Sequence, residues 1–315
     1  MGSAVKRHLE LSNRQIFKCN VVLQWKNPIQ LKSQISKKAA NFFACLTQGD
    51  EWEIYWTAGV GSMSSQDYDF AAEIVALEAL IDYLSANLFQ NGTSGSIAYA
   101  SSAGAVYAEC RDFHITEESN CSAKNPYSIN KIYLEQKLIN LALQNEKVKV
   151  LIARLSTLFG PGQSTEKKQG FLSHIARCSL RNKPVEIFVP LDTTRDYVFI
   201  DDAASDFIFA LEEISHSDKK YLTKIIASEN SVTISSIITV FDRLSKKRLH
   251  VIHKRNNLTG LYLPRVSYRS LYPKYLGNTQ RRHSFLEGAS ILFQFEKSAY
   301  LSGGSGGGPV DEKER

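Results

Sequence analysis

The sequence predicts an α/β protein with a doubly wound parallel sheet and a second, smaller C-terminal region. Three short apolar runs read as strands, at Trp52–Trp56, Ile97–Ser101 and Val148–Arg154, and helical patterns separate them. Strands that alternate with helices favour a parallel sheet with right-handed crossovers. With 315 residues, 43% of them hydrophobic, the chain can bury the core of one large α/β domain or one and a half.

The helices between these strands follow from the spacing of apolar residues. Asp67–Asn87 predicts an amphipathic helix, and Tyr127–Asn145 predicts a second long one. In the first helix four apolar side chains share a face: Ile74, Leu77, Ile81 and Leu84. No internal repeat of 20 to 50 residues is apparent.

Beyond Gly162 the pattern changes to shorter elements. Helices are expected near 170–181, 201–214 and 234–246, and strands near 183–189, 221–227 and 249–253. We expect residues 1–155 to form the first domain, with 190–215 returning to it, and residues 156–300 to form mainly a substrate-binding region. Residues 301–315, rich in glycine, serine and charge, predict a flexible tail.

Composition narrows the class of protein. A formal charge of +6 fits either a solvated basic surface or attraction of an anionic ligand, whereas no nucleic-acid motif appears. The five cysteines have no C-x-x-C spacing, which predicts reduced thiols and neither a zinc site nor a disulfide framework. No run approaches the ~18 apolar residues of a membrane span, and no signal core begins the chain. A soluble, cytoplasmic protein is expected.

Residues 101–131 carry the strongest chemical signal. Ser101 and Ser102 end a strand, and Tyr127 and Lys131 follow Pro126 where a helix begins. Residues at i and i+4 lie on nearly the same helix face, so the ammonium of Lys131 would favour the phenolate of Tyr127 and lower a pKa that starts near ~10. A strand-end serine can hold a substrate oxygen against that phenol. These groups form a proton relay for hydride transfer at a carbinol carbon.

The Y-x-x-x-K spacing alone is weak evidence, because Tyr133 and Lys137 repeat it a turn and a half later. A surface helix pair is the ordinary explanation for such a match. The flanking serines and Pro126 distinguish Tyr127 and Lys131.

Four ordered blocks extend this signal into a resemblance: SSAGAVY (101–107), NPYSINK (125–131), ARLSTLFGPG (153–162) and TRDYVFIDDAA (194–204). Together they resemble an extended short-chain dehydrogenase/reductase of the NAD-dependent epimerase/dehydratase family, from about Gly2 to about residue 295. The resemblance implies a Rossmann-like fold, an NAD or NADP cofactor and a nucleotide-linked sugar as substrate, in reactions typical of polysaccharide biosynthesis.

The resemblance also implies roles for individual residues. Tyr127 would be the general acid/base, and Lys131 would also bind the nicotinamide ribose. Ser102 is the expected hydroxyl partner, with Ser101 the alternative on the cofactor side, because the position that many relatives use is here Ala103. Both serines could instead cap the following turn.

The N-terminal part of the sequence, where the family binds its cofactor, departs from the family pattern. The family's first strand and its G-x-x-G-x-x-G turn, which cradles a pyrophosphate, have no counterpart except Gly2, which matches the last glycine. A mis-assigned start, a truncated chain and a decayed gene are the open explanations. We expect the missing strand to weaken both stability and cofactor binding. Ala58 and Gly59 resemble the loop under the cofactor, or form a plain turn.

The second strand is expected at Phe17–Gln24. Trp25 and Lys26 follow it where an acidic residue would take the ribose hydroxyls of NAD. Lys26 could meet the 2′-phosphate of NADP or lie on the surface, so the sequence leaves NAD and NADP both open.

Two further residues would face the substrate. Arg195 matches a family arginine that meets the substrate diphosphate, although a salt bridge to Asp196 or Asp201 is the alternative. Thr157 stands where many sugar-nucleotide epimerases carry an asparagine that touches the substrate. This difference weakens the expectation that the substrate is a sugar nucleotide. Relatives dimerise through the two long helices, so a homodimer is expected by resemblance.

Epimerase and reductase chemistry both stay open. Dehydration is less favoured, because the serine loop reads Ala103-Gly104-Ala105 without an acid pair. The alternatives are a family member without catalysis and a reductase of a non-nucleotide carbonyl compound.

Overall fold

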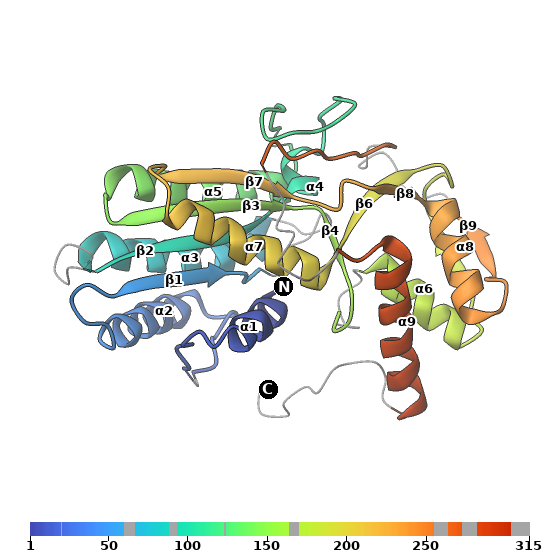
Figure 1. Ribbon diagram of the computed structural model, residues 1–315, viewed down its shortest axis with the longest axis horizontal. Coiled ribbons are helices and arrows are strands. Elements are labelled where there is room, and N and C mark those ends of the chain that lie inside the picture. The colour runs from blue at the N-terminus through green and yellow to red at the C-terminus, as the bar shows by residue number, and fades with distance from the viewer. Residues whose placement is uncertain are drawn as a thin grey trace. The chain divides into compact units, whose positions relative to one another are not determined.

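The structure is a computed structural model that describes residues 1–19, 21–59, 67–87, 93–122, 124–163, 170–254, 264–272 and 282–303 (Figure 1). It divides into two compact units. The first comprises residues 1–110, 119–155 and 204–225, and the second comprises 111–118, 156–203 and 226–315.

The first unit is built on a four-stranded sheet. Its strands are β1 (Glu51–Trp56), β2 (Ser94–Ser102), β3 (Val148–Leu155) and β7 (Tyr221–Ile226), in the order β1-β2-β3-β7 (Figure 1). The pairs β1/β2 and β2/β3 are parallel, as predicted. The strand predicted near 221–227 therefore belongs to this sheet rather than to the smaller region.

Helices cover the sheet because its strands are apolar on both faces. α2 (Pro28–Phe43), α3 (Asp67–Asn87) and α5 (Pro126–Gln144) share one core cluster with the sheet. Leu77 and Leu84 of α3 are fully buried there, which confirms the predicted apolar face. α7 (Ile200–Ser215) covers the opposite face of the sheet, because its Phe207 packs edge-on against Tyr55 of β1. Tyr55 is three residues after Trp52, so the side chains of these two residues point to opposite faces. The sheet is thus wound on both faces, as predicted.

The N-terminal part of this unit corrects one prediction. α1 (Gly2–Leu11) forms, but the described residues between Phe17 and Gln24 are not in a strand. A strand exists only where its backbone groups pair with a neighbour, and no strand of the described chain lies beyond β1 to receive this segment. Val21 and Val22 are consequently 42% and 43% exposed.

The second unit combines short strands with three helices. β4 (Thr157–Phe159) pairs parallel with β6 (Thr194–Phe199), and β6 pairs antiparallel with β8 (Ser231–Thr233); β5 (Val185–Ile187) pairs parallel with β9 (Val251–His253). α6 (Phe171–Leu180), α8 (Ile234–Ser245) and α9 (Phe285–Leu301) pack around a shared apolar cluster. The tail predicted at 301–315 lies outside the described residues from 304 onward.

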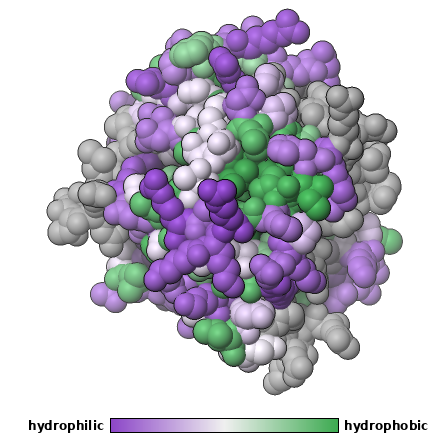
Figure 2. All heavy atoms as spheres, turned by 90° about the vertical axis from the view of Figure 1, so that its right-hand side faces the viewer, coloured by the Kyte–Doolittle hydropathy of each residue, from purple (hydrophilic) through white to green (hydrophobic). Residues whose placement is uncertain are grey.

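The surface of the second unit mixes polarity. Figure 2, which views the side where α8 and β9 lie, shows hydrophobic side chains gathered in one area among hydrophilic ones. In the described part of the chain, no helix is long and apolar enough to cross a membrane, and no His, Cys, Asp and Glu side chains form a group that could hold a metal ion. The five cysteines are free thiols.

Candidate active site

Tyr127 lies in the first turn of α5, where the sequence fixes the start of the helix. Pro126 occupies the first helical position, and Asn125 and Ser128 form a reciprocal capping box. The ring of Tyr127 stacks on the buried ring of Phe70 from α3, with centroids 5.9 Å apart and an interplanar angle of 19°. Tyr127 is half-buried, so its ring is held by packing while part of the side chain meets solvent.

Lys131, one turn later, is buried with 5% of its surface exposed. Its Nζ donates to Tyr99 Oη at 3.2 Å, lies 3.6 Å from a carboxylate oxygen of Glu73, and sits 5.7 Å from the centroid of the Tyr127 ring. Burial lowers the pKa of this ammonium, but the surrounding Tyr99, Tyr127 and Glu73 outweigh burial and raise the pKa above its ordinary value of 10.5. Lys131 is therefore a fixed positive charge beside Tyr127.

Glu73 links Lys131 to the loop after β1. The Nδ2 of Asn130 donates to Glu73 at 3.3 Å, while the Oδ1 of Asn130 is buried with no hydrogen-bond partner among the described residues. A Cβ placed on Gly59 would come within 3.4 Å of the same carboxylate. Ala58 and Gly59 thus lie where the sequence predicts, at the carboxyl end of β1, and the backbone of Gly59 passes close to the partner of Lys131.

The two serines at the end of β2 have different environments. Ser101 is buried, and its hydroxyl donates to Glu135 at 2.5 Å. Ser102 is half-exposed and caps α4 (Ala103–Val106) by accepting from the N–H of Ala105 at 3.3 Å. The hydroxyl hydrogen of Ser102 stays available while its oxygen caps the turn. Ser102 is therefore better placed than Ser101 to donate to a ligand.

A buried network supports the serine end of β2. Arg154 of β3 donates through Nη2 to Glu135 at 2.7 Å and through Nη1 to Tyr107 at 2.6 Å. Arg154 and Glu135 are 8% and 3% exposed, so this is a desolvated ion pair whose loss would leave a buried charge. It ties β2, β3 and α5 together next to Ser101.

Gly2 opens α1 against the loop that follows β1. A Cβ at this position would lie 2.7 Å from Thr57 Oγ1, so glycine permits an approach that a side chain would obstruct. This fits the role expected for the last glycine of a dinucleotide-binding turn, the close packing of a helix on a strand. Burial lowers the pKa of the Met1 amino group next to it.

The predicted substrate residues Thr157 and Arg195 lie in the second unit. Thr157 is exposed on β4, and Arg195 is half-buried on the neighbouring β6, two residues before Tyr197, the register partner of Thr157. The guanidinium of Arg195 donates to the carbonyl oxygen of Thr194 at 2.7 Å. Asp196, one of the salt-bridge partners weighed for Arg195, accepts hydrogen bonds from the hydroxyls of Ser156 and Ser228.

The second Y-x-x-x-K pair is a surface cluster. Tyr133 is 39% exposed and donates to Glu78 at 2.5 Å, and Lys137 lies 3.3 Å from the same carboxylate. Glu78 takes the place near Lys137 that Glu73 takes near Lys131, but its side chain is 32% exposed whereas that of Glu73 is 3% exposed.

Comparison with known proteins identifies the family. The sequence matches the NAD dependent epimerase/dehydratase family over residues 54–223, more than half of the chain. The chain belongs to this family. It is 30% identical over 162 residues to dTDP-4-dehydro-6-deoxyglucose reductase of Escherichia coli, a match that covers 51% of this chain and only 49% of that reductase.

Two solved epimerases share the fold of this family member. UDP-glucose 4-epimerase of Thermotoga maritima, solved with UDP-glucose, matches with a TM-score of 0.74 and 16% identity. UDP-glucose 4-epimerase of Thermus thermophilus, solved with NAD, matches with a TM-score of 0.73 and 18% identity. Both matches cover 95% of this chain and 96% of the other. Likeness at this identity establishes the Rossmann-like fold.

Four side chains around the site escaped the sequence analysis: Tyr99, Glu73, Glu135 and Arg154. Each is a polar residue inside an otherwise apolar strand or helix, as in Arg154 within VKVLIARL. A polar residue at a core position needs a partner, and that signal could have identified them.

Proposed function

We propose that this family member is an NAD(P)-dependent epimerase or reductase of a nucleotide-linked sugar, with Tyr127 as its proton-transferring residue. The observation that carries the proposal is the buried Lys131 ammonium, which lies 5.7 Å from the Tyr127 ring centroid in an apolar core and is held there by Tyr99 and Glu73. A buried, partnered cation beside a half-exposed phenol is an arrangement that serves general acid/base catalysis.

The first unit offers residues that fit a nicotinamide dinucleotide at two points. Gly2 leaves room at the start of α1 that a Cβ would fill. Gly59 has no side chain, so its backbone lies close to the carboxylate of Glu73. Lys131 would hold the nicotinamide ribose, as the family resemblance implies. When bound, the cofactor supplies a nicotinamide ring that can accept or return a hydride. The exposed Lys26 does not decide between NAD and NADP.

The chain's own residues would handle the proton. In oxidation, the phenolate of Tyr127 takes the proton of a substrate hydroxyl as the carbinol C–H leaves as hydride, and a carbonyl forms. Lys131 stabilises the phenolate by its fixed charge, and Ser102 donates a hydrogen bond to the substrate oxygen. In reduction the same steps run backwards, and Tyr127 gives its proton to the oxygen. Epimerisation requires both directions at one carbon, with the hydride returned to the opposite face.

The substrate residues rest on the family resemblance. Arg195 would meet the diphosphate, for which a guanidinium is well suited, and Thr157 would contact the sugar. Turnover of UDP- and dTDP-linked hexoses and 4-keto sugars, followed by nicotinamide absorbance and by chromatography of the sugars, tests the proposal. Turnover confined to simple carbonyl compounds, without binding of UDP or dTDP, would replace it with the non-nucleotide reductase.

A non-catalytic family member is the second candidate, and one observation favours it. The edge of β1 is open, so part of the cofactor-binding unit lacks a neighbour among the described strands. The chain keeps all three proposed catalytic residues (Tyr127, Lys131 and Ser102), and this opposes a non-catalytic protein. Absence of nicotinamide nucleotide binding by any form of the protein would favour this candidate.

We also infer a cytoplasmic homodimer assembled through α3 and α5. Ile129 and Leu143 of α5 are 52% and 61% exposed, which leaves apolar surface on this helix. Light scattering at micromolar concentration should give twice the chain mass; a monomer would contradict the dimer.

A further inference from the structure

Five basic residues lie together at one end of the second unit, although the sequence holds them in two separate runs. We call them the basic end: Arg181, Lys183, Lys246, Lys247 and Arg248. The first run precedes β5 and the second precedes β9. Because β5 and β9 are parallel, the segments that enter them lie side by side, and the N–H of Val185 donates to the carbonyl oxygen of His250 at 2.6 Å. The fold thus joins two basic turns into one surface.

The side chains of the basic end are all exposed, and within the described residues none of them forms an ion pair. The acidic residues of the neighbouring segments have other partners. Glu186 pairs with Lys254 at 2.5 Å, and the buried Glu296 pairs with Arg177 at 3.1 Å. Asp242 accepts a backbone N–H from the turn before β9 at 2.7 Å. The basic end therefore keeps its positive charge for a partner outside the chain.

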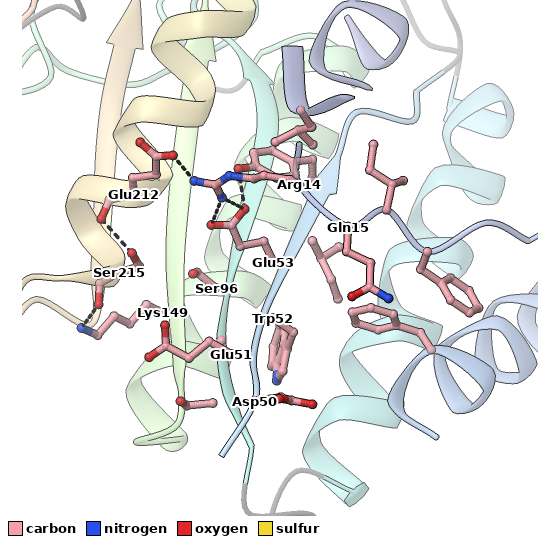
Figure 3. A pocket seen from close by; sticks show the side chains of 18 of the residues that line it. Arg14, Gln15, Asp50, Glu51, Trp52, Glu53, Ser96, Lys149, Glu212 and Ser215 are labelled. Atoms are coloured by element: carbon pink, nitrogen blue, oxygen red, sulfur yellow. Dashed lines mark hydrogen bonds and ion pairs between the residues drawn. The ribbon is translucent and has the colours of Figure 1, made fainter. Parts of the chain in front are cut away.

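Two basic residues in the large pocket of the first unit show the contrast (Figure 3). Arg14 places Nη1 2.7 Å from both carboxylate oxygens of Glu53 and also pairs with Glu212 of α7. Lys149 donates from Nζ to the carbonyl oxygen of Ser215 at 2.7 Å. These cations are already satisfied by the chain itself, whereas those of the basic end are not.

Apolar side chains stand beside the basic end. Arg177 of α6 pairs with Glu296 of α9, and one turn further on Arg181 and Tyr300 line the same small pocket. α6 and α9 therefore run side by side in the same direction and end together. Tyr300 is 46% exposed, and Leu301, the last residue of α9, is 72% exposed. This surface combines positive charge with an exposed tyrosine and an exposed leucine.

Helix dipoles explain part of the positive charge but not all of it. α6, α8 and α9 end next to these residues, at Leu180, Ser245 and Leu301. A helix C-terminus carries about half a negative charge, and basic side chains near it are stabilised. Three such ends offset about one and a half of the five positive charges, so a surplus of roughly three remains.

We propose that the basic end, with Tyr300 and Leu301, is a docking surface for a bilayer that contains anionic lipids. Lysine and arginine side chains are attracted to the negative potential of such a surface. Leu301 would enter the boundary between headgroups and acyl chains, and Tyr300 would lie at the level of the headgroups. A nucleic acid would match the charges but has no apolar layer to receive Leu301. The protein would rest on the bilayer, and this inference does not depend on the proposed activity.

Co-sedimentation of the full chain with lipid vesicles tests the proposal. The vesicles contain either phosphatidylcholine alone or phosphatidylcholine with phosphatidylserine. We expect binding at least about tenfold stronger to the vesicles with phosphatidylserine. This preference should disappear between ~0.1 M and ~1 M salt, where the screening length falls from about 10 Å to about 3 Å. Equal binding to the two kinds of vesicle at low salt would overturn the proposal without any variant.

A triple variant, Lys246→Gln with Lys247→Gln and Arg248→Gln, tests the charges. It should weaken binding to vesicles with phosphatidylserine by about 100-fold, close to fivefold for each basic residue. The matched control removes three exposed lysines of the first unit by substitution with glutamine: Lys18, Lys37 and Lys147. Both variants have the same net charge, and the control should bind within about threefold of the wild type. Equal losses in the two variants would show that net charge, and not this surface, attracts the lipid.

Leu301→Ser tests the apolar contact and separates a bilayer from a nucleic acid. It should weaken vesicle binding by about tenfold, because a leucine side chain loses its burial. Leu11→Ser is the control, since Leu11 ends α1 in the first unit and is 76% exposed. Binding to a DNA duplex that is tighter than binding to the vesicles, and unaffected by Leu301→Ser, would overturn the proposal in favour of a nucleic acid.

Discussion

One helix carries the same four-residue spacing twice, and the structure gives the two copies opposite environments. Lys131 is 5% exposed and lies among Tyr99, Glu73 and the ring of Tyr127. The side chain of Lys137 is 43% exposed, and its Nζ lies 5.2 Å from the ring centroid of the exposed Tyr133. Charge–charge and charge–ring contacts are screened in water and strengthened in a core. The comparison teaches that burial, rather than spacing, separates a candidate catalytic pair from a surface pair.

The largest expected difference is in activity. Tyr127→Phe removes the hydroxyl that exchanges the substrate proton, and we expect kcat/KM to fall by about 10²–10⁴-fold, the usual contribution of general acid/base catalysis. Tyr133→Phe removes a hydroxyl bound to Glu78 on the surface and should leave kcat/KM within about twofold. Steady-state kinetics on the identified substrate measures both, and similar losses in the two variants would refute the assignment.

The next difference is in stability. Lys131→Met leaves Glu73 buried without its cation, and breaking a buried pair in this way costs about 3–5 kcal/mol of the free energy of unfolding. Adding Glu73→Gln to Lys131→Met should recover part of this loss, since the uncompensated charge is gone. Urea denaturation of the three proteins, with Lys137→Met as the matched surface control, measures the coupling. An unchanged loss in the double variant would show that Glu73 and Lys131 do not interact.

A smaller effect separates the serines. Ser102→Ala should lower kcat by about 10²-fold through loss of the hydrogen bond to the substrate oxygen, and should weaken the α4 cap by about 1 kcal/mol. Ser101→Ala should reduce stability through Glu135 and affect kcat less. Kinetics paired with thermal unfolding distinguishes them; a larger kcat effect at Ser101 would reverse the assignment.

The smallest effect is the pH dependence of stability. The folded pKa of Lys131 is raised above its ordinary 10.5, so its contribution is complete below pH 10.5 and is lost as pH rises through the folded pKa. The difference in unfolding free energy between the wild type and Lys131→Met should therefore be constant from pH 7 to 9 and shrink above pH 10.5. A difference that grows in alkali would contradict the charged state of Lys131.

The sequence predicted the parts of this site that follow local rules. Pro126 and the capping residues fix the start of α5, and the alternation of apolar runs with helices fixes the parallel sheet. Glu73 and Tyr99 could not be paired with Lys131 in this way, because the three come from separate elements that only folding brings together. The strand predicted at Phe17–Gln24 was wrong for a related reason. Its β propensity is real, but a strand also needs a neighbour, and no strand of the described sheet lies beyond β1 to pair with it.

The most direct test of the buried pair is a fluorescence titration of NADH and NADPH into three proteins: the wild type, Lys131→Met and Lys137→Met. The account predicts binding of one nucleotide near micromolar Kd, weakened at least about tenfold by Lys131→Met and unchanged by Lys137→Met. Equal affinity in all three proteins, or no binding in any form, would contradict it.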